Sequence, residues 1–190
     1  MKKAIGKDGC SMDLTEKLLE RETFFEGKVL TITRDKVSLP DGRTSYREVA
    51  HHCGGVGILP LTPEGDVLLV RQYRYAFGRE TLEIPAGKMD LEGEAPLDTA
   101  IRELKEETGC TAGKVELLGS FLPSPGCFTE VLYTYLATDL TPGQVRPDDG
   151  EFLELVRMPF DTLLEKVLAG EIQDGKTAFA TLLTARRLGR

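Results

Sequence analysis

Apolar and polar residues alternate in two stretches near the N-terminus, residues 28–37 and residues 44–51. Alternation with a period of two is the pattern of a half-buried strand. The intervening Leu39-Pro-Asp-Gly-Arg has the composition of a turn, so the sequence predicts a β-hairpin. Residues 14–19 predict a short helical turn before it. Because an isolated hairpin is only marginally stable in water, we expect this one to pack on another surface.

The rest of the chain alternates between apolar runs of strand length and amphipathic stretches of helix length. The predicted strands are residues 56–61, 67–75, 81–86, 115–121, 131–137 and 151–158, and the predicted helices lie between Pro96 and Gly109 and at residues 161–169 and 176–188. Strands in two groups with helices around them predict an α/β fold, an α/β/α sandwich around a mixed sheet. We therefore divide the chain into an N-terminal β-hairpin region, residues 1–52, and a main domain, residues 53–190.

The helix between Pro96 and Gly109 carries the most informative side chains. Proline is tolerated in a first helical turn, and glycine readily adopts the left-handed conformation that ends a helix. Glu103, Glu106 and Glu107 fall within one arc of the helix surface, because successive residues are about 100° apart. This arc adjoins an apolar stripe, which consists of Leu97, Ala100, Ile101 and Leu104.

Three acids on one arc have two interpretations. Charged residues commonly form the solvated face of a surface helix. Alternatively, the carboxylates bind a divalent cation, which offsets the repulsion of about 0.2–0.5 kcal/mol expected between Glu103 and Glu107. The second interpretation is favoured because the acids adjoin the apolar stripe and Arg102 is spaced to pair with Glu106. The helix also follows a glycine-rich loop after a strand that ends at Ala86.

Residues 87–110 resemble the Nudix box, whose pattern is a glycine, five residues, a glutamate, seven residues and then R-E-U-x-E-E-x-G-U, where U is a bulky aliphatic residue. The matching positions are Gly87, Glu94, Arg102, Glu103, Leu104, Glu106, Glu107 and Gly109. The chain departs from the pattern twice, because six residues separate Gly87 from Glu94 and Cys110 stands at the last aliphatic position. The resemblance implies the Nudix fold and hydrolysis of a nucleoside diphosphate linked to another moiety.

The resemblance also implies a metal site. Mg²⁺ is the expected metal, with Mn²⁺ as the alternative, and it assists hydrolysis by bridging diphosphate oxygens and activating water. The implied ligands are the carboxylates of Glu103, Glu107 and Glu106 and the backbone carbonyl of Ala86. Glu106 and Arg102 are the catalytic candidates on the helix, and Arg102 is expected to orient a glutamate through an ion pair.

Two further segments resemble the ADP-ribose pyrophosphatase subgroup. Pro125 lies sixteen residues beyond Gly109, similar to the proline of that subgroup, although such a segment is also an ordinary turn. Residues 146–151 form an exposed turn on one interpretation. In the subgroup, a loop here supplies a catalytic base and a further metal ligand, which by position are Asp149 and Glu151. The subgroup usually has glutamate at the base position, so Asp149 is a departure.

Three residues outside the box are candidate substrate contacts. Arg74 resembles the phosphate-contacting arginine of the subgroup, and a planar guanidinium suits anions; otherwise it is a surface charge on an edge strand. Tyr46 matches a position where the family often stacks an aromatic ring on adenine, although strand tyrosines commonly only pack. Glu83 contacts substrate or merely ends a strand.

Composition narrows the partners. The formal net charge of −7 argues against nucleic acid and anionic membranes as partners. No apolar run is long enough to span a membrane, and the N-terminal residues lack the apolar core of a signal peptide, so a cytoplasmic location is expected. The four cysteines form no C-x-x-C pair and are expected to be free, buried thiols.

The residues and the resemblance together predict metal-dependent hydrolysis of the pyrophosphate bond of ADP-ribose or a related nucleotide sugar, which gives AMP and a sugar phosphate. The subgroup commonly forms dimers that exchange the N-terminal region, so a homodimer is expected. One alternative is a pyrophosphatase for another nucleotide sugar or a nucleoside triphosphate. Another is a non-catalytic ADP-ribose-binding module. A purely structural dimer domain gives no reason for the acidic cluster.

Overall fold

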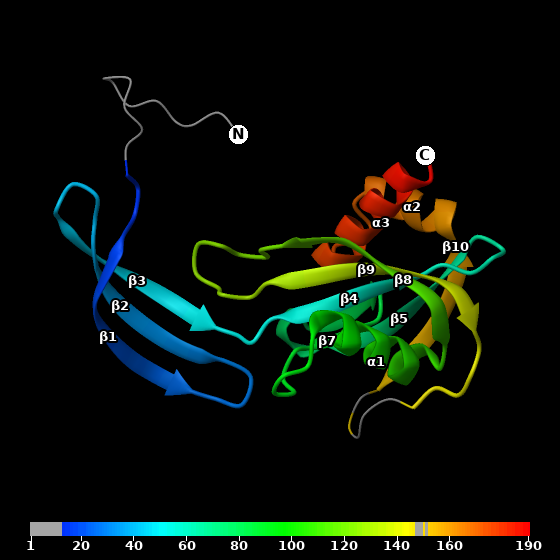
Figure 1. Cartoon of the computed structure of the whole chain (residues 1–190), viewed down its shortest axis with the longest axis horizontal. Helices are drawn as coiled ribbons and strands as arrows, with labels where there is room; N and C mark the ends of the chain where they lie inside the picture. The colour runs from blue at the N-terminus through cyan, green and yellow to red at the C-terminus, as the bar shows by residue number, and fades with distance from the viewer. Residues whose placement is uncertain (1–12, 147–149, 151) are drawn as a thin grey trace. The chain divides into compact units, whose positions relative to one another are not determined.

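The computed structural model describes residues 13–146, 150 and 152–190 of the chain. The chain divides into two compact units (Figure 1). The described part of the first unit comprises residues 13–52 and 124–129, and the second unit is built from the segments 53–123 and 130–190. Each unit has its own sheets.

The first unit is a three-stranded antiparallel sheet in the order β1-β2-β3. Its strands are β1 (Lys17–Glu26), β2 (Thr31–Ser38) and β3 (Thr44–His51). Residues 124–129 lie along β3, because the Ala50 N–H donates to the Cys127 carbonyl at 2.8 Å and the Thr129 N–H donates to the Ala50 carbonyl at 3.0 Å. Strands β2 and β3 pair antiparallel, which confirms the predicted hairpin. Residues 124–129, from much later in the chain, complete this unit.

The predicted helical turn at residues 14–19 is wrong, because β1 begins at Lys17. The strand is held by its pairing with β2, where Arg21 forms an ion pair of 2.5 Å with Asp35. The Gly27 N–H donates to the Leu30 carbonyl at 3.0 Å, which closes the β1–β2 turn and delays the start of β2 to Thr31. Cross-strand hydrogen bonds here override a local spacing that resembles a helix.

The described part of the second unit contains two sheets, three α-helices and one short 3₁₀ turn. The strands are β4 (Gly55–Pro60), β5 (Asp66–Arg74), β6 (Arg79–Glu83), β7 (Ala86–Lys88), β8 (Thr111–Phe121), β9 (Leu132–Thr141) and β10 (Leu153–Pro159), and the helices are η1 (Tyr75–Phe77, a short 3₁₀ turn), α1 (Pro96–Thr108), α2 (Phe160–Leu168) and α3 (Gly175–Arg187). The strand orders are β7-β4-β9-β8 and β10-β5-β6. In the larger sheet, β4 and β9 pair in parallel, whereas β4 with β7 and β8 with β9 pair antiparallel, so this sheet is mixed, as predicted.

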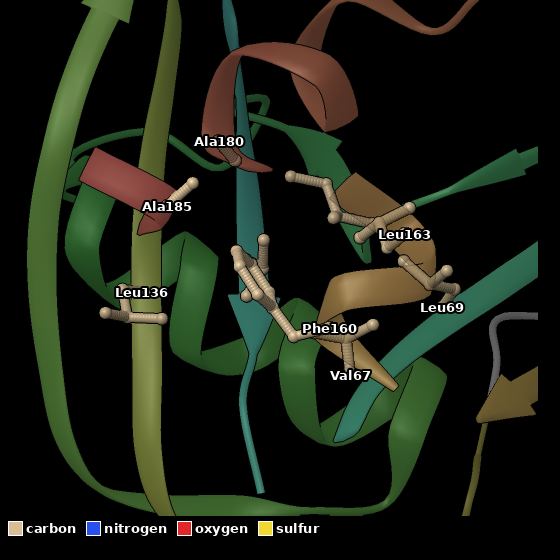
Figure 2. Close-up of a cluster of buried hydrophobic side chains, with 9 residues drawn as sticks. Val67, Leu69, Leu136, Phe160, Leu163, Ala180 and Ala185 are labelled. Atoms are coloured by element: carbon tan, nitrogen blue, oxygen red, sulfur yellow. The ribbon is translucent and has the colours of Figure 1, made fainter. Parts of the chain in front are cut away.

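Strand β4 is buried on both sides, because helices cover both faces of its sheet. Val56 and Ile58 belong to a core cluster with Ala100 and Leu104 of α1. Leu59 belongs to the opposite cluster, which α2 and α3 complete (Figure 2). Its buried members are Leu59, Val67, Leu69, Ile84, Leu136, Phe160, Leu163, Ala180 and Ala185. Successive strand residues point to opposite faces, so this burial gives the predicted α/β/α sandwich.

The described cysteines are free, but their burial differs from the expectation. Cys110 is buried, whereas Cys53 and Cys127 are exposed, so the prediction of buried thiols is wrong for these two. Each helix in the described residues is too short or too polar to cross a bilayer.

Candidate active site

Helix α1 buries two of its three candidate glutamates. The helix begins at Pro96 and ends at Thr108. Gly109 caps it, because its φ of 73° is left-handed and its N–H donates to the Lys105 carbonyl at 2.9 Å. Only 8% of Glu103 and 4% of Glu107 is exposed. Such burial excludes a merely solvated face for these two carboxylates, because removing a charge from water is costly unless it is compensated.

Arg102 compensates the carboxylates on one side of α1. Its guanidinium forms ion pairs with Glu103 at 2.7 Å, Glu106 at 2.9 Å and Glu94 at 3.2 Å. The predicted pairing of Arg102 with Glu106 is thus confirmed, and Glu94 reaches the helix despite the extra loop residue. Burial alone would lower the pKa of Arg102, but these three glutamates outweigh it and raise the pKa above its usual value.

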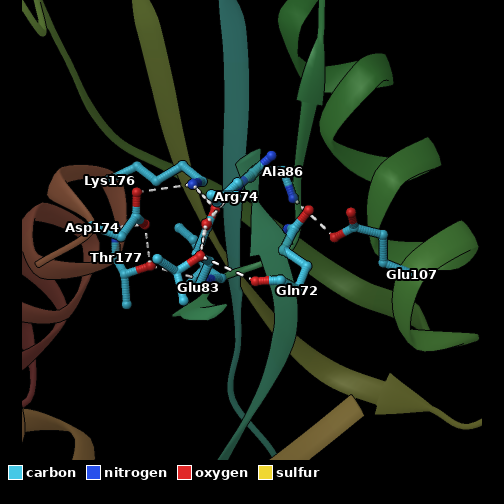
Figure 3. Close-up of polar contacts among 10 residues, drawn as sticks. Gln72, Arg74, Glu83, Ala86, Glu107, Asp174, Lys176 and Thr177 are labelled. Carbon is cyan, nitrogen blue, oxygen red and sulfur yellow. Dashed lines mark hydrogen bonds and ion pairs between the residues drawn. The ribbon is translucent and has the colours of Figure 1, made fainter. Parts of the chain in front are cut away.

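Strand β7 brings backbone against the two buried glutamates. The Glu103 carboxylate lies directly over Gly87, where a Cβ would be only 1.9 Å from Oε1. The Ala86 N–H donates to Glu107 Oε2 at 3.1 Å (Figure 3). Residues about a turn apart on α1 therefore contact two consecutive residues of β7.

This arrangement fits a divalent cation as far as it is described. Glu103 and Glu107 offer hard oxygen donors, which suit Mg²⁺, and the lack of a side chain at Gly87 lets the Glu103 carboxylate approach the backbone. Within residues 13–146, 150 and 152–190, no group of three or more His, Cys, Asp or Glu side chains gathers to hold a metal ion. The two glutamates are therefore a partial donor set. Asp149 and Glu151, the predicted base and further ligand, lie outside the described residues.

Glu83, at the end of β6, is the centre of a second charged network (Figure 3). Arg74 at the end of β5 donates from Nε and Nη2 to both Glu83 oxygens, at 2.7 and 2.6 Å. Thr81 Oγ1 donates to Glu83 Oε1 at 2.6 Å, and the Lys176 ammonium group donates to Oε2. Arg74 is therefore not an isolated surface charge, and Glu83 does more than end a strand.

Two cations keep the buried Glu83 carboxylate ionised. Burial raises its pKa, but the hydrogen bonds and charges of Arg74 and Lys176, with Thr81, outweigh burial and lower the pKa to about 2. The same contact with Glu83 raises the pKa of Arg74. Glu83 and Arg74 therefore remain charged at neutral pH.

The structure places Tyr46 on β3 of the first unit. Its side chain is 57% exposed, and the Arg34 guanidinium lies 5.3 Å from the ring centroid. The ring is therefore not part of a hydrophobic core, and its predicted role in stacking adenine remains a prediction. Pro125 lies in the segment 124–129 of the same unit.

Sequence reasoning missed the first turn of α3, which joins the Glu83 network. Asp174 caps the helix by accepting from the Thr177 N–H at 3.0 Å, and it pairs with Lys176 at 2.9 Å. Thr177 Oγ1 accepts from the Ile84 N–H at 2.8 Å. A signal was available, because Lys176 occupies a position in register with the apolar residues Ala180 and Leu183, where a charge needs a partner.

A cavity of about 400 Å³ lies beside the Glu83 network, since Thr81 and Asp174 line it. Its lining residues are Arg71, Arg79, Glu80, Thr81, Leu82, Val156, Glu171, Ile172, Gln173 and Asp174. None of them comes from α1 or β7, so this cavity does not include the glutamate cluster. The buried acids define the candidate active site better than the cavity does, because their negative charges suit a metal cation, which in turn would compensate the charge of a diphosphate.

Comparison with known proteins shows the family of the chain. Residues 51–180 match the family described as NUDIX domain, and the chain belongs to the Nudix family. The chain is 40% identical to the ADP-ribose pyrophosphatase of Bacillus subtilis (strain 168), over 88% of this chain and 91% of that protein. It is 38% identical to the methanol dehydrogenase activator of Bacillus methanolicus, over 87% and 90%. A solved structure of an ADP compounds hydrolase shares the fold, with a TM-score of 0.80 and 22% identity over 99% of this chain and 97% of that chain.

Substitution of Gly87 by alanine should displace the Glu103 carboxylate with little loss of stability, because the new Cβ meets the end of a flexible side chain. We expect the affinity for Mn²⁺, measured by electron paramagnetic resonance, to fall about tenfold, while the thermal unfolding midpoint changes little. Gly119→Ala is the control, since its nearest neighbour atom would be 3.4 Å away. An unchanged Mn²⁺ affinity in Gly87→Ala would contradict the placement of Glu103 in the metal site.

Glu83 should make stability depend on acid pH. Its pKa is lowered from 4.5 to about 2, so its contribution is complete above pH 4.5 and is lost as the pH falls towards 2. Urea unfolding should show that the difference in stability between the wild type and Glu83→Gln shrinks across this range, by on the order of 3 kcal/mol. Glu80→Gln, an exposed position on the same strand, is the control. A difference that stays constant with pH would refute the role of Glu83.

Proposed function

We propose that the protein hydrolyses the pyrophosphate bond of ADP-ribose or a related nucleotide sugar with the help of a divalent metal ion. The products are AMP and a sugar phosphate. The observation that carries this proposal is the pair of buried carboxylates, Glu103 and Glu107, held against Gly87 and Ala86. The similarity to an ADP-ribose pyrophosphatase over nearly the full length of both chains supports the substrate class.

The roles of the residues follow from their contacts. Glu103 and Glu107, with the Ala86 carbonyl, would hold the metal ion, and Glu151 would complete the ligand set. When bound, a divalent ion offsets the charge of the diphosphate and lowers the pKa of a coordinated water. Arg102 fixes the orientation of Glu103 and Glu106 by its ion pairs.

The remaining residues orient the substrate and accept a proton. Glu83 holds the Arg74 guanidinium by two hydrogen bonds, so that Arg74 can present its other donors to a phosphate. Tyr46 would stack on the adenine, and Asp149 would accept the proton of the attacking water, while Glu106 would assist Glu103 and Glu107 in holding the metal ion. Catalysis of this kind rests on positioning and charge compensation. Mg²⁺ is the metal we propose, with Mn²⁺ able to replace it.

The proposed activity can be tested with Glu107→Gln. The amide oxygen can still accept the Ala86 N–H, so the fold should persist, but a neutral amide is a poor ligand for a hard cation. We expect Mg²⁺-dependent hydrolysis of ADP-ribose to fall by on the order of 100-fold or more. Changes to residues that only support metal ligands cost about 10- to 100-fold, and loss of a ligand should cost at least as much. Liquid chromatography of AMP, with ADP-glucose, GDP-mannose and ATP as rival substrates, provides the measurement.

The exposed Glu116→Gln, on β8, is the matched control and should retain full activity. Full Mg²⁺-dependent turnover in Glu107→Gln would rule out the metal-ligand role. A wild-type protein that binds ADP-ribose without releasing AMP would instead identify a binding module.

We propose further that the first unit mediates a homodimer. Every residue of β1 is exposed, and four of its apolar side chains are 53–57% exposed: Leu18, Leu19, Phe24 and Phe25. The unpaired backbone groups of an edge strand can pair with another chain, and an exposed apolar patch is typical of an interaction site. A second copy of this sheet is the partner that needs no further component.

Phe24→Glu should therefore weaken the dimer, because it would place a charge in the contact between subunits. Light scattering coupled to size-exclusion chromatography should show a dimer for the wild type and a monomer for the variant at the same concentration. Leu168→Glu is the control, since Leu168 is 70% exposed in the second unit. A monomeric wild type would end the dimer proposal.

A further inference from the structure

Four charged side chains of alternating sign form a row through the second unit (Figure 3). Arg74 contacts Glu83, Glu83 contacts Lys176, and Lys176 contacts Asp174 at 2.9 Å. The inner members are buried, with 2% of Glu83 and 8% of Lys176 exposed. Lys176 therefore lies between two carboxylates. If its charge were removed, little water could reach Glu83 to compensate that carboxylate.

The row as a whole is neutral only because of Lys176. Two cations, Arg74 and Lys176, balance two anions, Glu83 and Asp174. Without the lysine charge, the single Arg74 guanidinium would face two carboxylates, and the row would carry a net charge of −1. An anion approaching Arg74 would then be repelled at short range, where a partly buried charge is poorly screened.

Arg74 retains donors for a ligand. Its bonds to Glu83 use Nε and one N–H of Nη2, out of five N–H donors in a guanidinium. Its side chain is 40% exposed, whereas that of Glu83 is 3% exposed. Glu83 therefore holds Arg74 from the protein side, and the outer part of the guanidinium can meet an anion from solvent.

The first turn of α3 also holds the strand that leads to the active site. The Ile84 N–H donates to Thr177 Oγ1 at 2.8 Å, and the Ala86 N–H donates to Glu107. Lys176 and Thr177 thus contact consecutive residues, Glu83 and Ile84, on the same strand segment. Lys176 therefore has two possible effects on the site: its charge acts on Glu83 and Arg74, and its packing helps to hold the segment at residues 83–84.

We infer that Lys176 is a positioning residue for the substrate diphosphate. Its ammonium group compensates part of the negative charge of Glu83. Glu83 can therefore orient Arg74 by hydrogen bonds while the positive charge of Arg74 remains available to attract the diphosphate. The inference rests on the proposed function, since it concerns how a diphosphate is bound. Lys176 itself does not touch the substrate and acts through Glu83 and Arg74.

The principal test is Lys176→Met, which keeps the length of the side chain and removes its charge. With Mg²⁺ and ADP-ribose, we expect KM to rise about tenfold while kcat changes by less than about threefold, because the glutamates of α1 are untouched. Calorimetric titration with α,β-methylene-ADP in metal-free buffer should show a similar loss of affinity. Lys166→Met, which removes an exposed ion pair with Glu171, is the control.

A double-mutant cycle separates the electrical role from a structural one. In an Arg74→Met background, Lys176→Met should change KM and α,β-methylene-ADP affinity by less than about twofold, because the group through which it acts is gone. Lys176→Arg, which keeps the charge, should restore affinity to near the wild-type value. Asp174→Asn keeps a helix-capping side chain and leaves the row with a net charge of +1, so KM should fall or stay the same.

Three results would overturn the inference. They are an unchanged KM and affinity in Lys176→Met, an equal loss with and without Arg74, or a rise in KM in Asp174→Asn as large as that expected for the lysine variant. If Lys176→Met fails to fold, Asp174→Asn and Lys176→Arg decide the question. A wild type without hydrolytic activity would refute the proposed function alone, because the metal-free titration still tests Lys176.

Discussion

Compensation of buried carboxylates is the constraint on which the second unit depends. Glu83, Glu103 and Glu107 are each less than 10% exposed, and each contacts a cation or a backbone donor. Leaving such groups uncompensated would cost several kcal/mol per charge. The groups that compensate these three carboxylates come from β5, β7, α1 and α3.

The segment between Glu83 and Gly87 is where these requirements meet. Ile84 is bonded to α3, Pro85 accepts the Ile58 N–H of β4 at 2.9 Å, and Ala86 donates to α1. Consecutive residues are thus held by three different elements, which leaves the backbone little freedom. Such an arrangement would preorganise the proposed site, because the proposed metal ligands and the residues that contact Arg74 adjoin one segment of the chain.

The first unit follows different physics. Its sheet has few buried residues, and ion pairs such as Arg21 with Asp35 link its strands. The apolar side chains of β1 remain exposed, although burial of such surface is the main source of stability for a sheet. The second unit has two complete hydrophobic clusters and the charged site. The proposed active site and the proposed dimer contact therefore lie in different units of the chain.

The sequence by itself determined the features that depend on local spacing: the start of α1 at Pro96 and its cap at Gly109, the arc of glutamates, the Arg102–Glu106 pair and the apolar strands of the sandwich. Only the tertiary structure decided that residues 17–26 form β1, and that Glu83 meets Lys176, which lies 93 positions later. The reason is physical. Periodicity reports which face of an element is apolar, whereas contacts between distant residues, and the hydrogen bonds that override local propensity, exist only after the chain has closed on itself.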